Sequence, residues 1–211
     1  TFGMLELAAP WLLPRLPAVQ AKHPDIDIRI AAGDALVSLD DDPELDLALR
    51  YYRPAHEPRG AAPLFGEVLT PVAAPALLQR QPLRAPDDLV RHTLLEEDDH
   101  RPSAEFLSWR HWLDEQAPGV QPRGWLYLNY TYQQIQAALS GQGLALARLA
   151  LVAELLERGE LVEPFGPAGR LHSPFGYWLL RRAGRQERPE LQAFEGWLLD
   201  QARATRARVG A

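Results

Sequence analysis

Residues 11–17 read WLLPRLP and residues 22–30 read KHPDIDIRI, and together they decide the fold. Apolar side chains recur at helical spacing through the first stretch, at Leu12, Leu13, Leu16 and Val19. His23 stands before a proline, and a residue in that position is pushed out of the helical region, so the helix ends there. Isoleucines then alternate with charged residues, with a period of two. The segment predicts a helix over residues 5–21, a tight turn and a strand over residues 26–31.

The rest of the chain continues this alternation of strands and helices. We expect further strands at residues 46–51, 67–74, 93–95, 125–128, 144–147, 161–165 and 177–180. We expect helices at residues 75–79, 87–90, 105–116, 133–140, 149–158 and 189–206, with loops at 53–63 and 166–176 and a frayed tail at 203–208. Strands that alternate with helices predict an α/β fold with parallel, helix-covered sheets.

Two candidate crossover points, residues 67–74 and 166–176, divide the chain into two lobes. Residues 1–74 plus 171–211 would form lobe I, and residues 75–170 would form lobe II. A cleft between two such lobes is a favoured place for a small ligand.

Composition excludes several classes of function. The 211 residues carry a net charge of −6, which argues against direct DNA binding by these residues. Cysteine is absent, so disulfides, thiolate nucleophiles and cysteine-based zinc sites are excluded. No apolar run approaches the roughly 20 residues needed to cross a bilayer. No signal peptide is visible, and the opening residues 1–5 look like the inside of a strand, so we expect more chain before them.

Several segments together carry a family resemblance. Beside residues 11–17 and 22–30 they are DLALRY at 46–51, LTPVAAP at 69–75, IQAALSGQGLALA at 135–147, GELVEPF at 159–165 and YWLL at 177–180. In this order they resemble the effector-binding domain of a LysR-type transcriptional regulator. The resemblance implies two Rossmann-like lobes of the type 2 periplasmic-binding-protein kind, with a small-molecule effector in the cleft and no chemistry of its own.

The same resemblance implies partners and a location. It implies a cytoplasmic homodimer, a tetramer in the full-length protein, that binds DNA through an N-terminal winged helix-turn-helix domain absent from these residues and contacts RNA polymerase. The dimer would use the first helix, so the face of residues 11–19 is a candidate dimer surface, with core packing as the alternative.

One wall of the family's pocket matches Glu6 and Leu7, at the start of the first helix. Backbone N–H groups at a helix start favour an anionic ligand. Glu6 would repel such a ligand unless it turns away, or it would bind a cationic one; the alternative is that Glu6 only stabilises the helix dipole. Arg50 and Tyr51 end their strand where open α/β sheets bind ligands, although Arg50 also suits a structural ion pair.

The opposite wall matches residues 129–132, at the start of the next expected helix. Thr131 has two open roles, capping this helix or donating its hydroxyl to a ligand. Tyr130 and Tyr132 provide rings with a polar tip that suit an aromatic or amphipathic ligand, and core packing of one ring is the alternative. Arg148 suits bidentate pairing with a carboxylate, or is an ordinary surface arginine.

Other candidates are weaker, and no stretch predicts a catalytic residue, a cofactor or a metal site. Residues 96–100 offer oxygen ligands without the spacing of a calcium loop, so a solvated loop is expected. Gly141 and Gly143 follow a helix, whereas phosphate motifs precede one, so they are expected to cap it. Two other classes remain open: a free solute-binding protein of a transporter, and an enzyme on the same two-lobed fold.

Overall fold

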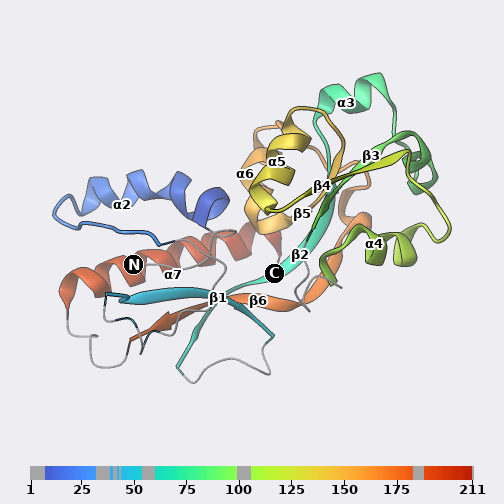
Figure 1. Cartoon of the computed structure of the whole chain (residues 1–211). Helices are drawn as coiled ribbons and strands as arrows, with labels where there is room; N and C mark the ends of the chain where they lie inside the picture. The colour runs from blue at the N-terminus through green and yellow to red at the C-terminus, as the bar shows by residue number, and fades with distance from the viewer. Residues whose placement is uncertain are drawn as a thin grey trace. The chain divides into compact units, whose positions relative to one another are not determined.

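The structure is a computed structural model of the chain and describes residues 8–31, 39, 42, 44–53, 60–98, 106–182 and 188–210. The chain divides into two compact units: unit 1 is Thr1–Glu67 with Pro174–Ala211, and unit 2 is Val68–Ser173 (Figure 1). Six strands are hydrogen-bonded in the order β1-β6-β2-β5-β3-β4. Two of them, β2 (Ala62–Val72) and β6 (Leu171–Arg181), contribute residues to both units.

The predicted first helix is present, but it is wound in three different ways. A π-helical turn, η1 (Ala8–Leu12), leads into a 3-10 turn, η2 (Leu13–Arg15), and then into α2 (Leu16–Lys22). Prolines have no N–H to donate and so interrupt regular α-helical bonding along this segment. Its apolar face is buried within unit 1, because Trp11, Leu12 and Val19 are all fully inaccessible. Core packing, the alternative to a dimer surface, is the arrangement observed in the described residues.

The C-terminal helix, α7 (Pro189–Val209), packs against that first segment. The indole N–H of Trp11 donates to the hydroxyl of Thr205 over 2.9 Å. The tail expected to fray is helical instead: Val209 is buried, and the guanidinium of Arg206 donates to the carbonyl of Leu64. The prediction of a frayed end was wrong because these residues have partners far away in the sequence.

Two expected strands are not formed. Residues 26–31 have no regular secondary structure, although their side chains alternate between half-buried and exposed as the pattern indicates. Residues 161–165 contribute a single antiparallel bridge, in which the N–H of Val162 donates to the carbonyl of Ala73 over 2.9 Å and the carbonyl of Val162 accepts from the N–H of Ala73 over 3.1 Å. A period of two describes side-chain exposure, but a strand also needs a neighbouring backbone to bond with.

Two strands are longer than expected and take in residues that look like loop. β2 begins at Ala62 and β6 at Leu171, and both cross between the units. Gly176 lies inside β6, where an added Cβ would be 3.2 Å from the carbonyl oxygen of Phe65. Glycine here reflects a close approach of two backbones and not a turn.

The sheet is mixed, whereas the sequence predicted parallel sheets. β1 (Leu47–Tyr52) runs antiparallel to β6, and β2 runs antiparallel to β5 (Leu144–Arg148). Parallel pairing occurs in unit 2, where β3 (Thr93–Glu97) lies between β4 (Gly124–Leu128) and β5. Helical crossovers connect these three strands, and such connections produce parallel pairs.

Unit 2 contains most of the helices that the sequence predicted. They are α3 (Pro75–Arg80), the 3-10 turn η4 (Pro86–Arg91), α4 (Trp109–Gln116), α5 (Thr131–Leu139) and α6 (Leu149–Glu157). The 3-10 turn η6 (Gly166–Gly169) lies in the segment that was predicted to be a loop. Asp87 is a residue type that suits a helix cap, but Ala85 holds the capping position of η4, and the carboxylate of Asp88 accepts from the N–H of Arg84 over 2.8 Å.

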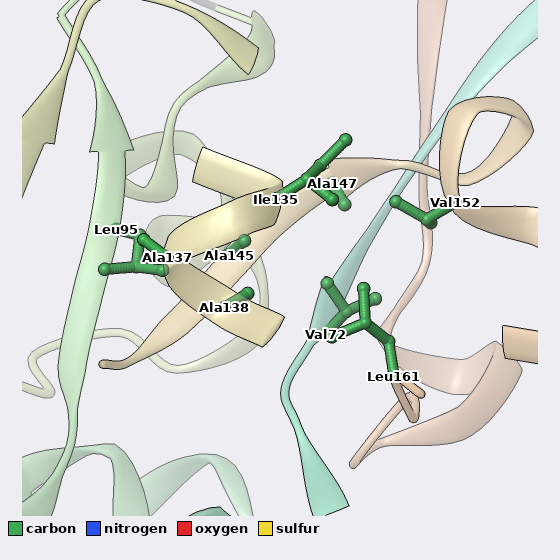
Figure 2. Close-up of a cluster of buried hydrophobic side chains, with 9 residues drawn as sticks. All are labelled: Val72, Leu95, Ile135, Ala137, Ala138, Ala145, Ala147, Val152 and Leu161. Carbon is green, nitrogen blue, oxygen red and sulfur yellow. The ribbon is translucent and has the colours of Figure 1, made fainter. Parts of the chain in front are cut away.

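The core of unit 2 lies between the parallel strands and the helices α5 and α6. Figure 2 shows the buried side chains of this core, namely Val72, Leu95, Ile135, Ala137, Ala138, Ala145, Ala147, Val152 and Leu161. Small alanines on α5 and β5 let the helix approach the sheet closely. On the other side of these strands, Trp109 and Trp112 of α4 are fully buried and their rings meet edge to face with centroids 5.4 Å apart, so both pack in the core.

The two glycines that follow α5 have different functions. Gly141 adopts the left-handed conformation, with φ of 69°, and its N–H donates to the carbonyl of Ala138, so the expected helix cap is confirmed. An added Cβ at Gly143 would be 2.4 Å from the carbonyl oxygen of Thr93. The first glycine permits a turn, and the second lets β5 lie beside β3.

Candidate functional site

Three polar side chains converge in unit 2 where the parallel strands end. Glu97 is the last residue of β3, Arg148 is the last residue of β5, and Thr131 is the first residue of α5, which follows β4. Because β3 lies between β4 and β5, the carboxyl ends of all three strands meet at one edge of the sheet. Ligands of open α/β sheets bind at this kind of edge.

The three side chains form a closed polar triangle, which we call the Arg148 cluster. The guanidinium Nη1 of Arg148 donates to the hydroxyl of Thr131 over 3.0 Å, and that hydroxyl donates to the Oε2 of Glu97 over 3.1 Å. The Nη2 of Arg148 lies 3.6 Å from the same Oε2. The side chains of Arg148 and Glu97 are 3% and 9% exposed, so this ion pair is held in a desolvated environment where charge interactions are strong.

The end of β3 is fixed from both faces of the sheet. The carbonyl of Leu95 accepts from the indole N–H of Trp109 over 3.0 Å and from the amide of Gln134 over 2.6 Å. Trp109 begins α4 and Gln134 lies in α5, so one helix on each side holds this peptide group. The orientation of Glu97, two residues further on, is therefore set by a rigid support.

The structure places the sequence-predicted residues of unit 2 together. Thr131 does not cap α5, because the capping position belongs to Tyr130 and the hydroxyl of Thr131 bonds to Glu97 instead. Arg148 is buried, which contradicts the surface-arginine alternative. Tyr130 and Tyr132 stack with ring centroids 5.7 Å apart and an interplanar angle of 15°, and neither is fully buried.

Glu97 is the member of the cluster that sequence reasoning did not single out. It stands in the acidic stretch 96–100, which was expected to be a solvated loop. Glu96 and Glu97 instead extend β3, so that expectation was wrong for these two residues; residues 99 and 100 lie outside the described residues. The missed signal was the position of Glu97 directly after a buried apolar strand, the same position that Arg148 has after its own strand.

Arg50 and Tyr51 belong to unit 1 and have partners there. Arg50 is 5% exposed, and its Nη1 donates to the carbonyl of Leu49 over 3.0 Å. The hydroxyl of Tyr51 donates to the buried carboxylate of Glu67, whose other oxygen accepts from Tyr177 over 3.0 Å. Two tyrosine hydroxyls therefore hold this carboxylate inside unit 1.

Glu6 and Leu7 lie outside the described residues. Within the described ranges, no group of three or more histidine, aspartate or glutamate side chains is arranged to hold a metal ion. Over the same part of the chain, no helix is both long and apolar enough to span a membrane.

Comparison with known proteins identifies the family. The sequence model of the LysR substrate binding domain matches residues 1–203. The chain belongs to the LysR substrate-binding domain family. It is 33% identical over 204 residues to the glycine cleavage system transcriptional activator of Escherichia coli (strain K12), covering 94% of this chain and 63% of that protein. It is 34% identical over 196 residues to the transcriptional activator AmpR of Pseudomonas aeruginosa, covering 91% of this chain and 62% of AmpR.

Solved structures of LysR effector domains have the same fold. The effector domain of Pseudomonas aeruginosa AmpR superimposes with a TM-score of 0.70 and 31% identity, covering 99% of this chain and 97% of that one. LysR effector domains have the type 2 periplasmic-binding-protein fold, so the predicted fold class is confirmed.

These comparisons settle the class of protein at the level of the domain. The chain spans less than two thirds of the length of the curated LysR-type relatives, which are transcriptional regulators. It is therefore homologous to the effector-binding domain of a regulator, and the alternative of a transporter's solute-binding protein has no support among these relatives. The family is regulatory, in contrast to the enzyme alternative.

Proposed function

We propose that this domain senses a small carboxylate-bearing molecule at the Arg148 cluster, and that binding changes how a LysR-type regulator engages DNA. The convergence of Arg148, Thr131 and Glu97 at the ends of three neighbouring strands is the observation that carries the proposal. The units would act as the two lobes expected from the sequence, residues 1–74 plus 171–211 and residues 75–170.

The chemistry of the cluster favours an anionic group on the ligand. Arg148 offers planar N–H donors that match a carboxylate, and Thr131 adds a hydroxyl. Both stand at the N-terminal end of the nine-residue helix α5, whose first N–H groups attract negative charge. Glu97 now accepts from the hydroxyl of Thr131 and lies 3.6 Å from the Nη2 of Arg148, and a ligand carboxylate would take over these two interactions.

The remaining residues assigned to the pocket would contact the rest of the ligand. Tyr130 and Tyr132 form a stacked pair beside the cluster and suit an aromatic or amphipathic body. Glu6, Leu7, Arg50 and Tyr51 would complete the opposite wall. Binding shifts the conformation only in so far as the ligand has different affinities for the two states.

The proposal extends to the whole regulator. We expect a cytoplasmic homodimer, tetrameric at full length, that binds DNA through a separate N-terminal domain and contacts RNA polymerase. No catalytic step and no cofactor belong to this function.

A thermal-shift screen of the purified domain tests the proposal. Amino acids, aromatic acids, amines and sugar acids are each added at high concentration. A ligand at about 100 times its dissociation constant adds about 2.7 kcal/mol of stability. For a chain of this size, each kcal/mol raises the melting temperature by roughly 2–4 °C. We expect hits among the carboxylates.

Variants assign the hit to a site. Thr131→Val keeps the shape of the side chain and removes the hydroxyl, and Tyr132→Ala removes a ring that is 37% exposed. Both should reduce the shift. Val90→Ala is the control, because Val90 is 52% exposed on η4 and is not part of the Arg148 cluster. A carboxylate hit that is unchanged in Thr131→Val and in Tyr132→Ala would place the ligand elsewhere and contradict the assignment.

A further inference from the structure

Unit 2 contains a second hollow, on the opposite side of β3 from the Arg148 cluster. It has a volume of about 920 Å³ and is lined by residues of β3, α4, the connection that follows α4, and β4. Neighbouring residues of a strand point to opposite faces. Glu97 therefore turns toward α5, where it bonds to Thr131, and Glu96 turns toward α4, where it bonds to the backbone of Trp109.

A half-buried carboxyl group forms the floor of this hollow. The Oε2 of Glu96 accepts from the backbone N–H of Trp109 over 3.0 Å. Burial raises the pKa of Glu96 to about 7, although the N–H groups of Trp109 and Glu97 and the charge of Arg110 lower it. A carboxyl group held in this way gains most from a partner that carries a positive charge.

Two exposed aromatic rings form a wall beside this carboxyl group. Trp125 is 38% exposed and Tyr127 is 59% exposed, and their rings stack with centroids 6.2 Å apart and an interplanar angle of 20°. In the parallel pairing of β3 with β4, Glu96 stands directly beside Tyr127. The carboxyl group and the aromatic faces therefore border the same space.

We propose that this hollow binds a small organic cation, with its ammonium group on Glu96 and its apolar or aromatic body against Trp125 and Tyr127. The faces of tryptophan and tyrosine rings carry negative potential and attract cations. An anionic ligand would meet the same ring faces and a carboxylate, and both would repel it. The volume is within the range of pockets that hold small molecules. This second ligand is independent of the one proposed for the Arg148 cluster.

Binding of the cation is coupled to a proton. The ammonium group bonds to the ionised form of Glu96, so affinity rises as pH rises through the pKa of this carboxyl group. The other charged or titratable residues that border the hollow are Arg110, His111, Asp114 and Tyr127, together with Glu97, whose carboxylate bonds to Thr131 on the far side of β3. Glu96→Gln separates the contribution of Glu96 from theirs, because it removes one titration and leaves the others in place.

Isothermal titration of the whole chain with phenethylamine tests the proposal. This amine stays protonated from about pH 6 to pH 8, and we expect its affinity to rise about tenfold over that range in the wild-type chain. 2-Phenylethanol and phenylacetate have the same ring without the positive charge and should bind at least about tenfold more weakly. Glu96→Gln should weaken phenethylamine binding by about tenfold and abolish its pH dependence.

Three further variants locate the binding. Trp125→Ala should weaken phenethylamine, because it removes an exposed ring without opening the core. Glu115→Gln is the matched control, since Glu115 is an exposed carboxylate on α4 that does not line the hollow. Thr131→Val should leave the amine affinity unchanged, and this separates the outcome from that of the Arg148 cluster.

Several results would overturn the proposal. They are no binding heat at millimolar phenethylamine, equal affinity for 2-phenylethanol, an unchanged affinity in Glu96→Gln, and loss of binding in Thr131→Val. The last result would move the amine to the Arg148 cluster.

Discussion

Glu96 and Glu97 are neighbours in one strand, but their side chains lie on opposite faces of the sheet and have different hydrogen-bond partners. Glu97 lies beside the guanidinium of Arg148 and accepts from the hydroxyl of Thr131. Glu96 accepts from a backbone N–H, and burial raises its pKa to about 7. The first carboxyl group has a buried guanidinium beside it, whereas burial raises the pKa of the second.

The difference shows that two glutamates adjacent in one strand can have different electrostatic surroundings, because their side chains lie on opposite faces of the sheet. Removing a carboxylate from water costs free energy, and this cost is offset only where an opposite charge and hydrogen bonds are in place. In this domain one side of β3 supplies such a charge from the end of β5, and the other side opens to a hollow. The predictions below test each side of this comparison.

The largest effect is expected from removing the cation beside Glu97. Arg148→Met leaves a buried carboxylate without its guanidinium and should lower the free energy of unfolding by about 3–5 kcal/mol, measured by urea denaturation. The double variant Arg148→Met with Glu97→Gln should recover part of the loss. Arg123→Met, at an exposed arginine just before β4, should change stability by less than about 0.5 kcal/mol. Equal losses in Arg148→Met and Arg123→Met would contradict the role given to the pair.

The next effect concerns the pH dependence contributed by Glu96. Its folded pKa is about 7, above the ordinary value of 4.5, so between these values the unfolded chain releases a proton that the folded chain keeps. This group therefore makes stability fall as pH rises from about 4.5 to about 7. At about pH 8, Glu96→Gln should be more stable than the wild type by about 1–3 kcal/mol, and the difference should shrink toward pH 5. Parallel stability curves for the two proteins would show that Glu96 titrates normally.

A smaller effect is expected from the hydroxyl that connects Arg148 to Glu97. Thr131→Val removes one bond from each partner without changing the volume, and should cost about 1–2 kcal/mol in urea denaturation. Thr131→Ser keeps the hydroxyl and should recover most of the loss. If Thr131→Ser were as unstable as Thr131→Val, the methyl group and not the hydrogen bonds would account for the effect.

The smallest effect is expected where a carboxylate is already in water. Glu115→Gln, on the exposed face of α4, should change the free energy of unfolding by less than about 0.5 kcal/mol at every pH. A larger change would indicate long-range charge effects on Glu96, which lowering the salt concentration would increase.

Patterns that depend on neighbouring residues were predicted well from the sequence. The helix over α5 and its glycine cap follow from apolar spacing and from Gly141, and β1 follows from alternation. Features that depend on distant residues were not predictable. Residues 26–31 carry a strand pattern but form no regular strand. The C-terminal residues stay helical because Arg206 bonds to the carbonyl of Leu64 and Thr205 accepts from the indole of Trp11.

The same distinction applies to the candidate site. Thr131 and Arg148 were predicted as site residues from the family resemblance, and the 3.0 Å hydrogen bond between them shows that they lie side by side. Glu97 was missed because its acidic neighbours suggested a solvated loop, and only the pairing of β3 with two other strands shows that it ends a buried strand. Sequence patterns indicate which face a side chain occupies, but the strand order determines which ends meet.

The two units differ in the number of chain segments that form them. Unit 2 is a single run from Val68 to Ser173, whereas unit 1 is assembled from both ends of the chain. A ribosome delivers the N-terminal part first. The indole of Trp11 bonds to Thr205, and Trp11 is synthesised 194 residues before it. All residues of unit 2 are therefore present while unit 1 still lacks α7. During synthesis, the Arg148 cluster can form before the first helical segment has its own core.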